Sequence, residues 1–339
     1  MNRRNAVLAL LATGAASPAC LAQRQDKVWR IGFMGQIGRP ESFATHIFSS
    51  LPLGLRELGY VEGKNLVIEW RFGDSRLERL PGMAADLVQA KMDVIVAAGT
   101  LSALAAQKAT TTIPIVFGNV SDPVGTGLVR SLARPEGNIT GLSTISTEIS
   151  TKVMQMLLRL VPRPTRVALL VNPLNPNHVR AVKDIQATGQ QFGVRVQTVE
   201  ARAPQEIEPA FAAMAQDGAD ALIVPMDGLF IQQRRQVAGL AAKYQLPSAS
   251  TDGEYAKEGG LLSYGTDQHA IFRHVAGYVD KILKGARPAD LPVEQPTKFD
   301  LIINRKTAKT LGRTIPQSLL ISATDVIDWC AVICEPGGG

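Results

Sequence analysis

The residues with the clearest chemical potential are two hydroxyls that follow a short apolar run in the first third of the chain. Residues 93–98 are apolar apart from Asp93 and end at Gly99, which is typical of a strand covered on both faces. Thr100 or Ser102 can cap a helix that begins there and whose first backbone N–H groups lack internal partners. With the helix dipole, these groups favour a ligand carboxylate. The alternative is that one hydroxyl only caps the helix.

Two aspartates follow predicted strands, one in each half of the chain. Asp122 can bind a ligand ammonium or fix the loop that does, and an Asp before Pro123 is also an ordinary helix cap. Asp227 follows the run 221–225, and its alternative role is that of a solvated turn residue before Gly228. A carboxylate opposite a helix N-terminus suits a zwitterion such as an amino acid.

Further polar side chains stand at other strand ends. Gln36 and Asn172 follow the first strand of each half and can hydrogen-bond a polar ligand, as can Asn175, although the two Asn-Pro pairs are also plain turn dipeptides. Tyr264 is the aromatic candidate for stacking on the ligand, with core packing as its alternative. We expect two more aspartates to line the hinge or the mouth of the site: Asp252 and Asp267.

Sequence patterns of catalysis are missing from the chain. No nucleophile elbow, phosphate-binding loop, zinc-protease helix or full dinucleotide fingerprint occurs. The histidines show no metal spacing, so we predict no catalytic residue, no metal and no cofactor; these histidines are His46, His178, His269 and His274.

Strands and helices alternate through the first half. Such alternation indicates a parallel sheet with helices on both faces. A proline at position 52 predicts that the first helix begins late or kinks, and a short helix is expected to end at 128–132. The predicted strands are 28–34, 66–71, 94–98 and 113–117, and the predicted helices are 42–58, 77–90 and the segment after Gly99.

The second half repeats this order at an offset of about 130 residues, a length typical of two similar lobes. The predicted fold class is therefore α/β, with two doubly wound parallel-sheet lobes joined by a hinge. The predicted strands of the second half are 167–171, 195–199, 221–225, 246–248 and 260–264, and its predicted helices are 179–192, 206–216, 231–244 and 270–283.

The first residues are typical of an export signal. Arg3 and Arg4 precede an apolar run over 6–16 that is too short to span a membrane, and small residues allow a cut after Ala22. We therefore predict a signal peptide over 1–22 and a soluble periplasmic protein. An anchored N-terminus and a lipoprotein modified at Cys20 are the alternatives, and the signal can be of the Sec or the twin-arginine kind.

Charge and cysteines restrict the partners further. The net charge of +6 over 339 residues is modest, and the basic residues form no run interleaved with aromatics, which argues against nucleic-acid binding. After removal of the signal only Cys330 and Cys334 remain. They can pair in an oxidising compartment, and they do not make a metal site.

Several motifs give the chain a resemblance to a known family over about Val28 to Ile327. The motifs are residues 113–117, 121–124, 127–129, 137–143, 259–260, 264–267 and 304–312. With them the chain resembles the periplasmic substrate-binding proteins of ABC importers, in the family with the tryptophan/tyrosine-binding (TrpX-like) members. The resemblance implies a type I binding-protein fold, a three-segment hinge and a small-molecule ligand between the lobes.

The predicted domains follow from the repeat and the resemblance. They are residues 28–142 with about 265–290, residues 143–264 with about 291–330, and a flexible tail over 331–339. We predict a monomeric importer component that traps a small molecule, such as an amino acid or another small carboxylate, and delivers it to an ABC permease of the inner membrane. The alternatives are an exported α/β enzyme acting on a small acidic substrate, with an aspartate as base, and a sensor for a membrane receptor.

Overall fold

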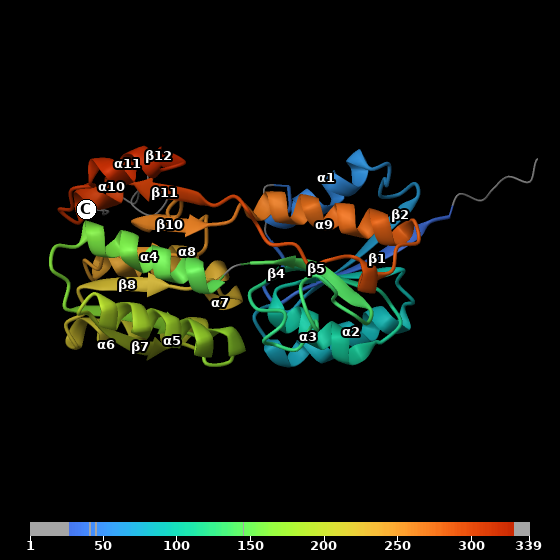
Figure 1. Ribbon diagram of the computed structural model, residues 1–339, viewed down its shortest axis with the longest axis horizontal. Helices are drawn as coiled ribbons and strands as arrows, with labels where there is room; N and C mark the ends of the chain where they lie inside the picture. Colours follow the sequence, from blue (N-terminus) through green and yellow to red (C-terminus); the bar gives the residue numbers. More distant parts are fainter. Residues whose placement is uncertain (1–26, 41, 45, 145, 329–339) are drawn as a thin grey trace, which may run out of the picture.

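The computed structural model describes residues 27–40, 42–44, 46–144 and 146–328. Within them the chain forms two α/β lobes that lie side by side (Figure 1). The predicted signal peptide, the possible lipid attachment at Cys20, the pair Cys330 and Cys334 and the predicted tail lie outside the described residues.

The first lobe is built on a five-stranded parallel sheet in the order β2-β1-β3-β4-β5. Its central strand is apolar on both faces because helices cover both, as expected for a parallel sheet. The strands are β1 (Trp29–Gly35), β2 (Leu66–Phe72), β3 (Val94–Ala98), β4 (Ile115–Val120) and β5 (Ile139–Ser143).

Two helix pairs cover the first sheet. On one face, α1 (Ser50–Glu57) and α9 (Gln268–Leu283) bury Leu51, Leu55, Phe272 and Val275 against β1 and β4. On the other, α2 (Leu80–Gln89) and α3 (Thr100–Ala109) bury small and branched side chains. Figure 1 shows α3 and α9 on opposite sides of β4. The late helix α9 thus returns to the first lobe.

The second sheet has the order β7-β6-β8-β9-β10-β11-β12, so its first five strands repeat the order of the first sheet. It differs from the predicted all-parallel sheet because β11 runs antiparallel to β10. The strands are β6 (Arg166–Val171), β7 (Arg195–Glu200), β8 (Ala221–Val224), β9 (Ser248–Ser250), β10 (Leu262–Gly265), β11 (Asp300–Asn304) and β12 (Asp325–Ile327).

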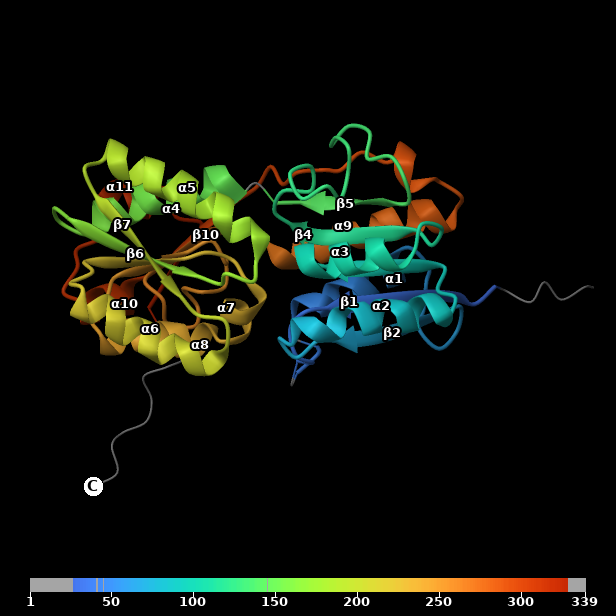
Figure 2. The same cartoon turned by 90° about the horizontal axis from the view of Figure 1, so that it is seen from below.

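The second lobe has its own helices and its own cores on the two faces of the sheet. One short helix, α7 (Gly228–Gln232), lies at the edge that faces the first lobe in both views (Figures 1 and 2). The other helices are α4 (Ser146–Leu160), α5 (Pro176–Gln191), α6 (Pro204–Gln216), α8 (Arg234–Lys243), α10 (Arg305–Thr310) and α11 (Gln317–Ser322).

The chain passes between the lobes three times: after β5, between β10 and α9, and after the 3-10 turn Pro288–Asp290 on the way to β11. Before the third passage, Glu294 pairs with β5, because the Ser143 N–H donates to the Glu294 carbonyl at 2.9 Å. Residues up to 294 therefore pack on the first lobe, slightly beyond the predicted boundary.

One local prediction was wrong, and the prediction that the first helix begins late because of Pro52 was confirmed. Residues 122–132 form turns and no helix, because the Asp122 side chain accepts from Gly125 N–H and closes a tight turn instead. The helix predicted from residue 42 begins at Ser50 after a 3-10 turn over Ile47–Ser49, which leaves Pro52 in its first turn, where proline is tolerated.

Candidate ligand-binding cleft

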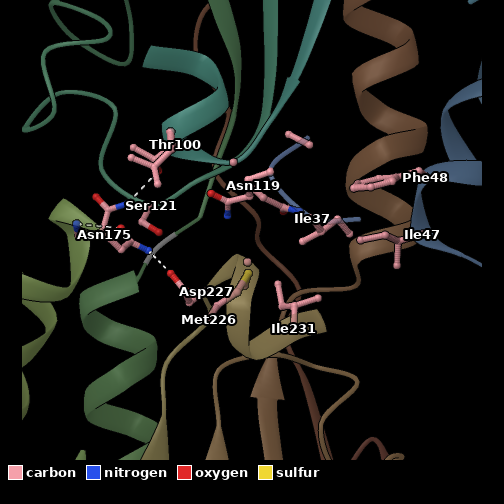
Figure 3. Close-up of a pocket in the computed structure, with 16 residues that line it drawn as sticks. Ile37, Ile47, Phe48, Thr100, Asn119, Ser121, Asn175, Met226, Asp227 and Ile231 are labelled. Carbon is pink, nitrogen blue, oxygen red and sulfur yellow. Dashed lines mark hydrogen bonds between the residues drawn. The ribbon is translucent and has the colours of Figure 1, made fainter. Parts of the chain in front are cut away.

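A cleft that is partly open to solvent lies between the lobes. The first lobe contributes the residues that follow β1, β3 and β4, and the second lobe contributes α7 and the start of α5 (Figure 3). Such a position at the carboxyl ends of parallel strands is where open α/β sheets bind ligands. The lining residues are Gln36, Ile37, Ile47, Phe48, Ala98, Gly99, Thr100, Leu101, Asn119, Ser121, Asn175, Asn177, Met226, Asp227, Gly228 and Ile231.

The N-terminus of α3 supplies the first polar part of the cleft. Gly99 stands at its N-cap with φ of +87°, a backbone conformation that favours glycine. Thr100 is buried, and its Oγ1 accepts from the Asn177 side chain of the second lobe at 2.8 Å. No side chain caps α3, so the first N–H groups of this helix are available to an anion.

Asp227 supplies the negative charge of the cleft from the second lobe. Its carboxylate caps α7 by accepting from Leu229 N–H at 2.8 Å, and it accepts from the side chains of Asn172 and Asn175 at 3.1 and 2.8 Å. All three donors are neutral. The side chain is only 3% exposed, so it is largely shielded from water.

Among the described residues, the one basic side chain within 4.0 Å of the Asp227 carboxylate is the buried His178. Arg202 lines a small cavity next to Asp227 without an ion pair to it. His178 Nε2 lies 4.0 Å from Asp227 Oδ2, beyond hydrogen-bond distance. Burial lowers the pKa of His178 more than Asp227 raises it, so the imidazole is mainly neutral at pH 7. Its Nδ1 accepts from Asn172 N–H at 2.8 Å, which leaves the proton on Nε2. Among the described side chains, the Asp227 carboxylate therefore has no cationic partner within hydrogen-bond distance.

Apolar side chains form the other part of the cleft. Ile37, Ile47 and Phe48 come from the first lobe, and Met226 and Ile231 face them from the second lobe (Figure 3). Phe48 is held by an aromatic cluster, in which it packs edge-on against Phe272 of α9 at 5.0 Å between ring centroids. The cleft thus joins a polar end to an apolar end.

Contacts across the mouth show that the two lobes are closed on each other. Besides the bond between Asn177 and Thr100, the Gln232 side chain of α7 accepts from Gly38 N–H at 3.4 Å and from the Ser75 hydroxyl. Both partners of Gln232 belong to loops of the first lobe, so these bonds exist only when the lobes approach.

The structure brings together four of the seven residues predicted to bind ligand. Gln36, Thr100 and Asp227 line the cleft, and Asn172 lies beneath it as a support of Asp227. Asn175, considered with them, also lines it.

The other predicted residues lie away from the cleft. Ser102 is fully buried within α3, Asp122 closes the turn to Gly125, and Tyr264 stacks on Phe299 at 5.8 Å between ring centroids. Asp252 pairs with Arg234 Nη2 at 2.8 Å instead of facing the ligand space. Asp267 caps α9 in the second passage between the lobes, where a hinge role was predicted.

Several lining residues were missed from the sequence. Ser121 directly precedes the aspartate that was chosen and belongs to the same polar stretch after β4, whereas Asn119 lies within β4 and was not considered as a ligand contact. Asn177 follows an Asn-Pro pair of which only Asn175 was considered as a ligand contact. The apolar lining residues have no sequence signal that separates them from the core.

The described residues contain no group of three or more His, Cys, Asp or Glu side chains that could hold a metal ion. They also contain no helix with both the length and the apolar character needed to cross a membrane.

Two similar lobes, closed over a cleft that both of them line, define a two-lobed ligand-binding protein. Residues 44–327 match the model of the ABC transporter substrate-binding protein family, so the chain belongs to this family. Its architecture is that of the type I periplasmic binding proteins, and its role is to bind a solute for an ABC transporter.

Three relatives illustrate the likeness. A tyrosine-binding protein of Clostridioides difficile is 27% identical over 76% of this chain and 74% of its own length. The structure of a conserved domain protein from Vibrio cholerae is 28% identical with a TM-score of 0.83, covering 89% of this chain and all of that one. An ABC domain from Streptococcus pneumonia in complex with L-Trp is 27% identical with a TM-score of 0.81, covering 88% of this chain and 99% of its own.

Proposed function

We propose that this protein binds an amino acid with a large apolar side chain and delivers it to an ABC permease. The observation that carries the proposal is the buried Asp227 carboxylate, which has only neutral hydrogen-bond donors and faces a helix N-terminus across the cleft. A buried charge is costly unless it is paired, so a ligand cation is the natural partner.

A zwitterion with an apolar side chain fits all three parts of the cleft. The ligand ammonium pairs with Asp227, and the ligand carboxylate meets the N–H groups at the start of α3 near Thr100. The side chain of the ligand then extends toward Phe48 and Ile231. Because the ligand touches both lobes, its binding favours the closed state.

The relatives support this ligand class. The Clostridioides difficile protein is named for binding tyrosine, and the Streptococcus structure holds L-Trp. The predicted export signal and the family's transport role support a site of action in the periplasm, where we propose that a monomer presents its closed form to the permease. The proposed role involves no catalysis, so the ligand leaves the protein chemically unchanged.

Calorimetry on protein stripped of ligand by unfolding and refolding tests the proposal. The chain from Gln23 onward is titrated with L-tryptophan, L-tyrosine, L-phenylalanine and L-leucine, and with L-glutamate, L-lysine, ribose and adenosine as controls. We expect binding by one or more of the first group and a rise in melting temperature that grows with ligand concentration. Binding of only a sugar or a nucleoside, or recovery of an altered ligand by mass spectrometry, would contradict it.

A further inference from the structure

Asn119, near the end of β4, has a buried acceptor that no described residue satisfies. The residue lines the cleft, and Figure 3 shows it near the middle, between the polar and the apolar residues. Its Oδ1 is buried and has no hydrogen-bond partner in the described chain. A buried acceptor without a donor is costly, so an unpaired carboxamide oxygen in a ligand cleft indicates a donor on the ligand.

The backbone holds Asn119 in a conformation that few residues tolerate. Its φ is +61°, and the pairing of β4 with β5 shifts register between Phe117 and Val120. Such a bulge redirects side chains at strand ends, and asparagine accepts a left-handed backbone more readily than most residues do. Strained backbone of this kind is concentrated at functional sites.

A chain of hydrogen bonds fixes which end of the amide faces the ligand. The Asn119 Nδ2 donates to Gln268 Oε1, and the Gln268 Nε2 donates to Thr266 Oγ1 at 3.0 Å, with the Thr266 carbonyl at 3.4 Å. A carbonyl oxygen only accepts, so Gln268 must present its nitrogen to Thr266 and its oxygen to Asn119. The Asn119 oxygen is therefore the atom left for the ligand.

We propose that Asn119 Oδ1 is the first-lobe acceptor for the ligand's ammonium group, which then bridges Asn119 and the Asp227 carboxylate of the second lobe. This inference rests on the proposed function. Gln268 and Thr266 are positioning residues, and both are buried in the second passage between the lobes. The ligand's amine is thus held by one acceptor from each lobe, and one of these acceptors is connected to the hinge.

The test compares ligands with and without an amino group. Calorimetry measures the dissociation constants of L-tryptophan against indole-3-propionate, and of L-tyrosine against 3-(4-hydroxyphenyl)propionate. Asn119→Gly is the main variant, because glycine adopts the positive φ freely and should leave the fold intact. We expect this variant to reduce the preference for the amino acid over its desamino analogue by about tenfold or more.

The positioning role has its own variant and a matched control. Gln268→Met keeps the side-chain length and removes the hydrogen bonds of the amide to Asn119 and Thr266, so the same preference should fall by a smaller factor than in Asn119→Gly. The control is Gln190→Met, an exposed helix position on α5, which should leave the preference unchanged. An equal loss of affinity for both members of a pair in Asn119→Gly would overturn the inference, since a structural role affects them alike.

Failure of the proposed function can be told apart from failure of this inference. If the wild-type protein binds neither amino acid, the proposed ligand class is wrong, and mass spectrometry of the solute released on unfolding then decides about Asn119. An amine retained by the wild type and lost from Asn119→Gly supports the ammonium site. A retained solute without an amino group overturns it.

Discussion

Asp227 carries a charge that a single substitution can remove while its cap to α7 is kept. Asparagine is as good an N-cap as aspartate and can still accept from Leu229 N–H. Asp227→Asn should therefore weaken amino-acid binding by about tenfold to a hundredfold, the effect of losing a charge-assisted bond, with a modest fall in melting temperature because Asn175 loses its acceptor. Calorimetry checks this, with the exposed Asp217→Asn as control. Unchanged affinity would mean that Asp227 is only a cap.

A second prediction at the scale of the residue concerns acid stability. Burial, with smaller contributions from Arg234 and His269, lowers the pKa of His46 from 6.5 to about 4. The folded state thus disfavours the charged imidazole, and the stability this residue contributes is complete above pH 6.5 and is lost as the pH falls toward 4.

His46→Asn tests this dependence, because asparagine can still cap the 3-10 turn at Phe48. Urea unfolding between pH 7.5 and 4.5 should show a smaller decline of the unfolding free energy in the variant than in the wild type. Equal declines would show that His46 has the same pKa in the folded and unfolded states.

At the scale of the element, the pairing of β4 with β5 determines where Asn119 points. Gly141 of β5 has φ of +151°, and an added Cβ there would lie 2.1 Å from the Phe117 carbonyl oxygen. Gly141→Ala should destabilise the protein by about 3 kcal/mol or more and weaken ligand binding, because the strand must move. Denaturant unfolding and calorimetry measure the two effects.

The opposite result is expected at Gly82 in α2, where an added Cβ meets nothing within 4 Å. Gly82→Ala should stabilise the protein by about 0.5–1 kcal/mol, because alanine loses less backbone entropy in a helix than glycine does. It serves as the control for Gly141→Ala. A loss of stability in both variants would show that the effect at Gly141 does not depend on the collision with Phe117.

The elements were largely predictable, and the cleft only in part. Apolar runs that end in polar turns predicted the parallel strands and placed Gln36, Thr100 and Asp227 at their ends. Asn119 depends on a bulge that has no local sequence signal. The side chain of Tyr264 packs on Phe299 instead of facing the ligand, because Tyr264 lies on β10 next to β11. The strand β11 was not predicted from periodicity, so this packing could not be predicted either.

For the whole molecule, closure is stabilised by bonds that the ligand does not make. Gln232→Ala removes the acceptor shared by Gly38 and Ser75, so the open form should gain population and ligand affinity should fall about three- to tenfold. Small-angle scattering of the ligand-free variant should give a larger radius of gyration. The neighbouring Gln233→Ala is the control, and equal radii for both variants would show that Gln232 does not hold the mouth closed.

The contact between Ser75 and Gln232 also makes the protein suitable as an optical reporter. The two residues lie on opposite lobes at the mouth, and their contact exists only while the lobes are together. A polarity-sensitive dye can be attached to Ser75→Cys once Cys330 and Cys334 are replaced, so that the label has a single site of attachment in the mature chain. The dye would contact the second lobe while the mouth is closed and would be exposed to water whenever the mouth opens. Its emission would then follow the concentration of free solute in real time, without a second reagent or a coupled enzyme.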